Sequence, residues 1–333
     1  MELVVSLAYC LVISFLFITL FKGLRISAVL GMILAGIVCG SSYSRSVFLE
    51  PNLGTIAIIG DLGLLSIMFL AGMEVSWSTM FKETKDAAVV ALFASIFPMM
   101  LGFLTFMLLG FSVWISFFVG ICMSITAEAT KAKVLLEVKK LKTKIGSLMM
   151  GVGILDDIMG LGLFVLVGYW FSVGFEVRDA MMLSGAIMAF FFGVITHREI
   201  GRTEKRIPLL EKILLYLVSP FFYVSMGISF SAHSAIIEPT LVLIIIVVAF
   251  TGKMIGTLLT KPYTKLKLNQ LYLLGLGMNS RGAVELALAF IAFRAGFLPV
   301  NIYSGLIIMA LITTLLFPPL FTRIVIKNPD IMN

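Results

Sequence analysis

Two adjacent carboxylates lie inside a long apolar run of this sequence. Asp156 and Asp157 stand within residues 146–171, where the residues on both sides are apolar, so neither carboxylate can reach water by bending its side chain outward. Two like charges this close cannot both be ionised cheaply, so one of them is expected to hold a proton near neutral pH. Carboxylate oxygens are also hard ligands that suit Na⁺ or Li⁺. Competition between a proton and a monovalent cation for this pair is the minimal chemistry of cation–proton exchange.

Other ionisable residues interrupt apolar runs as well. Each costs roughly 2.5 to 3.5 kcal/mol at a helix centre on insertion scales, so each needs a partner or a function. Lys253, in the stretch 252–256, is the expected counter-charge, because a lysine–aspartate bridge can exchange its partner for a cation. Asp61 and Glu74 lie towards opposite ends of one run and are interpreted as structural. The remaining members of this group are Glu128, Arg281 and Glu285.

Two of the apolar runs contain polar stretches at mid-membrane depth. One stretch is 124–130, and the other is 279–282, which follows Gly275 and Gly277. Unwound backbone at this depth is tolerated where it is buried in protein or lines a cavity, so both runs are predicted to be interrupted helices that frame a transport site. Glu128 and Arg281 are placed to complement the partial charges of the half-helix ends.

The elements that must position these residues are membrane-spanning helices. The 333 residues are 60% hydrophobic and only 13% charged, which excludes an ordinary soluble domain, and no short alternating segments suggest a membrane barrel. The predicted fold class is therefore an all-α polytopic bundle with inverted repeats and two interrupted helices. The eleven predicted spans are 3–21, 26–40, 53–76, 86–110, 113–137, 145–172, 179–196, 208–232, 238–260, 269–295 and 299–325.

The basic residues predict how this bundle is oriented. With eleven spans, one face collects only Arg45, Arg178 and Arg294, whereas the other collects twenty basic residues, six of them between Lys131 and Lys144. Because positive charge marks the cytoplasmic face, the N-terminus is expected outside and the C-terminus inside a cell (inner) membrane. The net charge of +7 is interpreted as this topology signal, which leaves no reason to expect a nucleic-acid partner.

The chain is predicted to be one integral membrane domain over residues 1–333, without a soluble regulatory domain. The two interrupted spans are five apart, so they enter the membrane in opposite directions, which indicates inverted repeats over about 26–172 and 179–325. The glycines Gly146, Gly153 and Gly160 recur every seven residues, and Asp157 lies within a turn of the last two, so close helix approach is expected there.

Several stretches together resemble the monovalent cation:proton antiporter-2 family, within the sodium/proton exchanger group. Asp156-Asp157, Lys253 and Arg281 are the specific part of this resemblance. The weaker matches, which cover nearly the whole chain, are 29–31 with 35–36, 69–74, 124–127, 153–157, 220–227, 252–256 and 279–285.

The resemblance implies a core domain that moves against a scaffold domain, with the ion site where two broken helices cross. It implies that Asp157 carries the ion and the proton, that Asp156 pairs with Lys253, and that Thr126 lines the crossing. It further implies a structural charge cluster of Arg281 with Glu128 or Glu74, and a homodimer surrounded by lipid. Transported Na⁺, Li⁺ or K⁺ and protons are the expected ligands, and no cofactor is expected.

One departure from the family is visible in the sequence. About 28 residues separate Asp157 from Gly185, where relatives usually have two more spans, so the chain is expected to be about two spans short. Because two missing spans are an even number of membrane crossings, the later spans keep the same orientation in the membrane.

The residues leave more than one activity open. Na⁺(Li⁺)/H⁺ antiport is favoured by Asp156, since relatives with an amide there are often potassium-linked, but K⁺/H⁺ antiport fits the same scaffold. A sodium-coupled organic-anion symporter of similar architecture is a further alternative. An intramembrane aspartyl protease is disfavoured, because its two aspartates come from separate helices, so the chain is not expected to be an enzyme.

Overall fold

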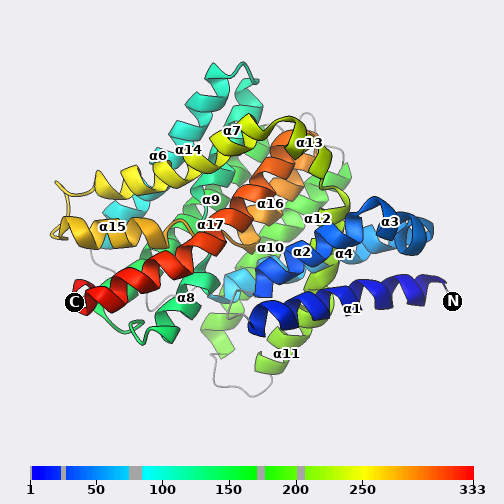
Figure 1. Cartoon of the computed structure of the whole chain (residues 1–333), viewed down its shortest axis with the longest axis horizontal. Coiled ribbons are helices and arrows are strands. Elements are labelled where there is room, and N and C mark those ends of the chain that lie inside the picture. The colour runs from blue at the N-terminus through cyan, green and yellow to red at the C-terminus, as the bar shows by residue number, and fades with distance from the viewer. Residues whose placement is uncertain (1, 24–27, 75–84, 171–176, 201–206) are drawn as a thin grey trace. The chain divides into compact units, whose positions relative to one another are not determined.

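The computed structural model describes residues 2–23, 28–74, 85–170, 177–200 and 207–333. Within these ranges the side chains of residues 74, 129, 165, 167–170, 177–180, 197–200, 207–208 and 235 are not described. Over these ranges the secondary structure is entirely helical. The N-terminal helices are α1 (Glu2–Gly23), α2 (Ala28–Gly40), α3 (Ser42–Ser44), η1 (Arg45–Leu49), η2 (Glu50–Asn52), α4 (Leu53–Glu74), α6 (Lys85–Leu108), α7 (Val113–Ser124), α8 (Glu128–Glu137) and α9 (Lys144–Trp170). The remaining helices are α10 (Val177–Ile200), α11 (Ile207–Ile213), η3 (Leu214–Val218), α12 (Ser219–Ile228), α13 (Ala232–Ile237), α14 (Pro239–Leu258), α15 (Leu268–Gly277), α16 (Ala283–Arg294), α17 (Val300–Lys327) and η4 (Pro329–Met332) (Figure 1).

Each of the eleven predicted segments coincides with one helix or with a short series of helices. Among the described residues, seven helical stretches are long and apolar enough to cross a membrane, and three shorter apolar helices accompany them. The two predicted interruptions are present: α7 and α8 are separated by residues 125–127, and α15 and α16 by residues 278–282. The helical, polytopic character expected from the composition is confirmed.

The chain divides into two compact units. Unit 1 consists of Met1–Val75 and Met181–Ala232, and unit 2 consists of Ser76–Ala180 and His233–Asn333. Each unit therefore combines helices from both halves of the chain. Asp156, Lys253 and both interrupted helices belong to unit 2, so the candidate site lies within one unit.

Unit 1 is held together by close helix contacts at small residues. On α2, a Cβ at Gly36 would collide with the Tyr223 carbonyl, and one at Gly40 with the Gly227 carbonyl, both on α12. Gly60 of α4 lies directly against Ser225, which also belongs to α12. Small residues permit this approach in an environment where burial of apolar area no longer drives helix association, so packing contacts must supply the attraction.

Unit 2 surrounds the site with α6, α7, α9, α14 and α17. The helix α6 carries Pro98 in its interior, and Gly252 of α14 leaves room for that proline ring. Gly256, one turn further along α14, accommodates the Phe93 carbonyl. This close packing of α6 on α14 brings Ser95 of α6 and Lys253 of α14 to the same side of α9.

Candidate ion-binding site

The two interrupted helices are joined to each other at their breaks. The backbone N–H of Ala127 donates to the Ser280 carbonyl at 2.9 Å, and the Ser280 hydroxyl donates to the Ala127 carbonyl at 3.2 Å. A side chain at Gly282 would collide with the Ala127 side chain, so the second break requires its glycine for this approach. Backbone groups that leave a helix inside a membrane must find partners, and here the two breaks satisfy each other.

Arg281 closes one end of the first broken helix. Its Nη1 donates to the Ile125 carbonyl at 2.6 Å and to the Cys122 carbonyl at 3.5 Å, where α7 ends. The guanidinium therefore complements the partial negative charge of a helix C-terminus. Its carboxylate partner is Glu285, one turn later on α16, at 3.8 Å. Backbone bonds in both directions to the Thr314 hydroxyl of α17, each 3.0 Å, fix the break.

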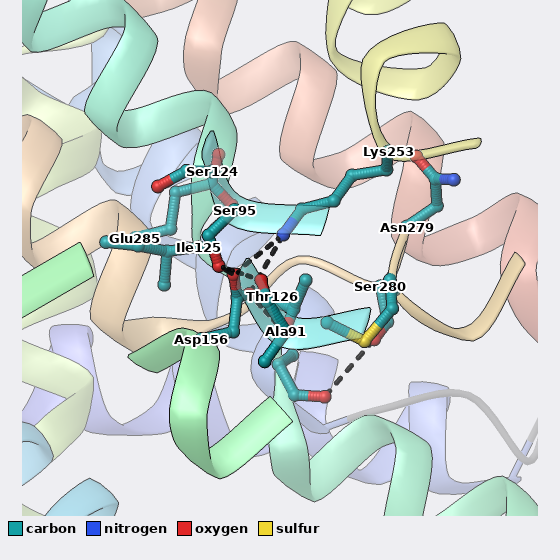
Figure 2. A network of polar contacts seen from close by, with 12 residues as sticks. Ala91, Ser95, Ser124, Ile125, Thr126, Asp156, Lys253, Asn279, Ser280 and Glu285 are labelled. Atoms are coloured by element: carbon teal, nitrogen blue, oxygen red, sulfur yellow. Dashed lines mark hydrogen bonds and ion pairs between the residues drawn. The ribbon is translucent and has the colours of Figure 1, made fainter. Parts of the chain in front are cut away.

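Asp156 pairs with Lys253 in the centre of unit 2. The Lys253 Nζ lies 2.9 Å from Asp156 Oδ2 and 3.0 Å from Oδ1, and both side chains are completely buried. Thr126, in the first break, donates to Oδ2 at 3.0 Å, and the Ser95 hydroxyl contacts Oδ1 (Figure 2). A carboxylate offers about four acceptor positions, and here each of its two oxygens faces two donor groups.

Asp157 lies beside this pair on α9 and is 5% exposed. The glycines that flank it face the first broken helix: Gly153 lies against the Glu128 and Lys131 side chains, and Gly160 against Ile125. The predicted close approach at these glycines is therefore confirmed. Both aspartates thus stand on the stretch of α9 that packs against the crossing.

Glu128 pairs with Lys131 at the start of α8. Lys131 is 0% exposed, forms an ion pair with Glu128, donates to the Thr126 hydroxyl at 3.2 Å and contacts Met278 Sδ at 3.8 Å. The assignment of Lys131 to a basic cytoplasmic loop was wrong, because α8 continues the broken helix and carries this lysine into the core. Of the expected cluster of Arg281 with Glu128 or Glu74, the alternative with Glu128 is not formed, since Glu128 and Arg281 each pair with a partner three or four residues further along the chain.

The structure brings most of the expected site residues together but not all of them. Thr126, Glu128, Asp156 and Lys253 form one connected network with Lys131, while Arg281 and Glu285 pair at the end of α7. Asp61 belongs to unit 1 and is half-buried on α4, outside this network. The expected part of Glu74 in the charge cluster falls outside the described side chains.

Two residues of the network were not expected from the sequence. Ser95 is one of two hydroxyl residues in the apolar helix α6, and nothing in its neighbourhood distinguishes it from a serine that bonds only its own helix. Its hydroxyl also lies 2.8 Å from the Ala91 carbonyl. Lys131 carries a usable signal, because it lies three residues after Glu128 and the two would share a helix face. Its position among five further lysines obscured that spacing.

The oxygen atoms at the crossing suit a monovalent cation as cargo. The aspartate carboxylates, the Thr126 hydroxyl and the carbonyls of the breaks are hard ligands of the kind that alkali cations accept. No group of three or more His, Cys, Asp or Glu residues that could hold a metal ion occurs within the part of the chain described. Of these oxygens, those of Asp156 are already contacted by Lys253 and that of Thr126 by Lys131.

The sequence matches a known transporter family, and the fold resembles a solved structure. The family described as sodium/hydrogen exchanger, transmembrane, matches residues 11–176 and 162–327. The fold is similar to that of the sodium proton antiporter MjNhaP1 from Methanocaldococcus jannaschii at pH 8, with a TM-score of 0.68 and 15% identity over 98% of each chain. This likeness covers the whole bundle, with both units included.

Several cation/proton antiporters are similar in sequence to this chain at low identity. Cation/H(+) antiporter 17 of Arabidopsis thaliana is 26% identical over 392 aligned residues, which cover 96% of this chain and 48% of the plant protein. A Na(+)/H(+) antiporter of Enterococcus hirae is 26% identical, with 91% of this chain and 94% of the relative covered. The Na(+)/H(+)-K(+) antiporter GerN of Bacillus cereus is 22% identical, with 88% of each covered. The chain spans about half the length of the plant relative.

The family match covers nearly all of the chain, and two of the residues on which it was expected, Asp156 and Lys253, form a buried ion pair. This chain therefore belongs to the transmembrane sodium/hydrogen exchanger family, in its monovalent cation:proton antiporter-2 type, a family of multi-pass transporters.

Proposed function

We propose that this protein is a monovalent cation:proton antiporter and that Na⁺ or Li⁺ is its preferred cation. The observation that carries the proposal is the fully buried Asp156–Lys253 pair, joined through Thr126 to a crossing of two interrupted helices. A lysine in this position can leave its aspartate when a cation arrives, so that charge in the core stays compensated.

In the proposed cycle Asp157 exchanges a proton for the cation, and Asp156 exchanges Lys253 for the same cation. Asp157 releases one proton as the cation binds, and Lys253 can release a second proton once the cation has displaced it from Asp156, which favours more than one proton per cation. Unit 2 holds all of these groups, so we assign it the role of the moving core and unit 1 that of the scaffold. Alternating access then exposes the crossing to one side of the membrane at a time.

The division into units supports the proposed inverted repeats of residues 26–172 and 179–325. The first two helical segments of each repeat, α2 with α4 and α10 with the series α11–α12, belong mainly to unit 1. The last three of each, including the interrupted pair, belong to unit 2. A repeat that contributes equivalent helices to both units is the arrangement expected when two halves share one transport cycle.

A K⁺/H⁺ antiporter on the same scaffold is the second candidate. One similar protein is named for both Na⁺ and K⁺, so relatives of this chain do not share a single cation. The ligand chemistry of carboxylate and hydroxyl oxygens accepts either ion.

A transport assay decides between these candidates. The purified protein is reconstituted in liposomes that contain a pH-sensitive dye, and Na⁺, Li⁺ and K⁺ are added in turn across the neutral and alkaline range. The proposal expects a cation-dependent pH change with Na⁺ and Li⁺ that is larger than with K⁺. A response to K⁺ alone would replace the first candidate by the second, and absence of a pH change with every cation at every pH would reject both.

A further inference from the structure

The contacts of Lys131 determine how the Thr126 hydroxyl can be used. An ammonium group donates hydrogen bonds and has no acceptor, so the 3.2 Å contact between Lys131 Nζ and Thr126 Oγ1 has only one possible direction. The threonine oxygen accepts from the lysine, and its single hydrogen is left to bond Asp156 Oδ2 at 3.0 Å. Thr126 is therefore held as a donor towards the aspartate while Lys131 remains charged.

Lys131 itself is fixed from several sides. Its ion pair with Glu128 lies on the same face of α8, and its contact with Met278 Sδ reaches the end of α15. Gly153 of α9 provides the space, because a Cβ there would collide with both the Glu128 and Lys131 side chains. The contacts with Glu128, with Met278 and with the backbone of α9 at Gly153 together hold the Lys131 ammonium beside Thr126.

A transported cation would need the oxygen that Lys131 already uses. A cation bound to the remaining lone pair of Thr126 Oγ1 would lie within a few ångströms of the ammonium on the same oxygen, in a buried environment where like charges repel strongly. The Glu128 carboxylate offsets only part of this repulsion, since the ammonium is the end of the pair that contacts Thr126.

We propose that Lys131 and Glu128 form a positioning pair that commits the Thr126 hydroxyl to Asp156 and thereby lowers the affinity of the site for the transported cation. This inference rests on the proposed function. It assigns to α8 a determinant of cation affinity that is separate from the aspartates and from Lys253.

The test replaces both partners, so that no buried charge is left alone. In the variant Glu128→Gln with Lys131→Met, the apparent dissociation constant for Na⁺ or Li⁺ is measured from the cation-dependent rise in unfolding temperature of the purified protein in detergent. The proposal expects tighter binding by at least about tenfold. Removal of a unit charge about 4 Å away at an effective dielectric constant of ~20 would alone give on the order of a thousandfold, and the simultaneous loss of the Glu128 carboxylate cancels part of this gain. The matched control combines Glu137→Gln at the exposed end of α8 with Lys139→Met in the exposed turn that follows, and it should leave the affinity unchanged.

The role of Thr126 is tested in the same measurement. In a Thr126→Val background, the Glu128→Gln and Lys131→Met changes should alter the affinity clearly less, because the hydroxyl on which the ammonium and the cation compete is gone and only the longer-range repulsion remains. An unchanged affinity of the double variant when Thr126 is present would contradict the proposal. An equal effect with Thr126 present and in the Thr126→Val background would also contradict it, because the pair would then act by charge alone.

Two further outcomes are also decisive. A second neutral pair, Glu128→Gln with Lys131→Gln, is made in parallel, and failure of both pairs to fold while Thr126→Val folds normally would make the pair purely structural and overturn the proposal. Because cation binding is measured without transport, a wild-type protein that binds a cation but exchanges no protons would reject the proposed function. The difference in affinity between the wild type and the double variant would still decide this inference.

Discussion

At the residue scale, the Asp156 carboxylate is surrounded by more donors than an ordinary ion pair provides. Lys253 reaches both oxygens, and Thr126 and Ser95 approach one oxygen each. A buried carboxylate with this many donors is well compensated, whereas removal of one charged partner leaves the other without compensation in a region that water does not reach. The cost of opening this pair is therefore the cost that an arriving cation has to offset.

This argument predicts non-additive effects of substitutions in the pair. Lys253→Met alone and Asp156→Asn alone should each destabilise the protein by about 3–5 kcal/mol, the range for breaking a buried ion pair. The double variant should be less destabilised than the sum of the two, because it buries no unpaired charge. Unfolding temperatures of the four proteins in detergent measure this, and simple additivity would show that the two side chains do not depend on each other.

Asp157 is predicted to be indispensable for exchange. Asp157→Asn keeps the size of the side chain and removes the charge that a proton or cation would replace, so cation-dependent proton movement should fall to the level of protein-free liposomes. Asp330→Asn, an equal change at an exposed position of η4, is the matched control and should leave exchange intact. Full activity of Asp157→Asn would remove this residue from the role of carrier.

The sequence predicted the principal pair but not its complete surroundings. Asp156 and Lys253 were predictable because each is a charged residue with a high cost in an apolar run, and Thr126 because it lies in a polar stretch that resembles the family. Ser95 was not, since a serine in a membrane helix normally bonds the preceding turn and carries little cost. Lys131 was assigned to a loop because linear charge counting cannot tell a lysine at the start of a buried half-helix from its solvated neighbours.

At the scale of elements, glycines determine which helices can meet. The motif around Gly36 brings α2 against α12, and Gly153 brings α9 against α8. The positions of both helix breaks were predictable, because serine, threonine and asparagine in mid-run compete with the helix for backbone hydrogen bonds. The pairing of the breaks through Ala127 and Ser280 was not, since it depends on contacts between segments more than 150 residues apart.

Two glycines on the same helix provide a direct comparison. A methyl group at Gly153 would collide with the Glu128 and Lys131 side chains, whereas at Gly162 nothing lies within 4 Å. Gly153→Ala should therefore destabilise unit 2 and weaken exchange. Gly162→Ala should be neutral or stabilise the protein by up to about 1 kcal/mol, the difference in helix propensity between the two residues.

The unfolding temperatures of the Gly153→Ala and Gly162→Ala variants in detergent distinguish these outcomes. Equal tolerance of alanine at both positions would mean that α9 does not approach α8 as closely as the network requires.

At the scale of the whole molecule, the length of the chain is its most unusual feature. The alignment with the plant antiporter runs over 392 positions, which exceeds the 333 residues of this chain, so the relative carries residues that this chain lacks. The two family matches overlap at residues 162–176, a stretch that includes the end of α9. This is where the sequence predicts that two spans are missing, and an even number of missing spans leaves the orientation of the later helices unchanged.

The charge distribution predicts that orientation. Reassigning Lys131 to the core removes one of twenty basic residues from the predicted cytoplasmic face, and the imbalance over three on the other face persists. Green fluorescent protein fused after Asn333 should therefore be fluorescent in a bacterial host, and alkaline phosphatase fused there should be inactive. The opposite pair of results would mean that the bundle is inverted or that one predicted span does not cross.

The most direct test of the account is the coupling of two fluxes in opposite directions. Liposomes that contain the purified protein are loaded with radioactive Na⁺ at equal pH on both sides, and Na⁺ efflux and internal pH are followed together. The account predicts that protons enter as Na⁺ leaves, that each flux stops when the other is prevented, and that Asp157→Asn abolishes both. Na⁺ efflux without proton entry, or protons moving out together with Na⁺, would contradict it.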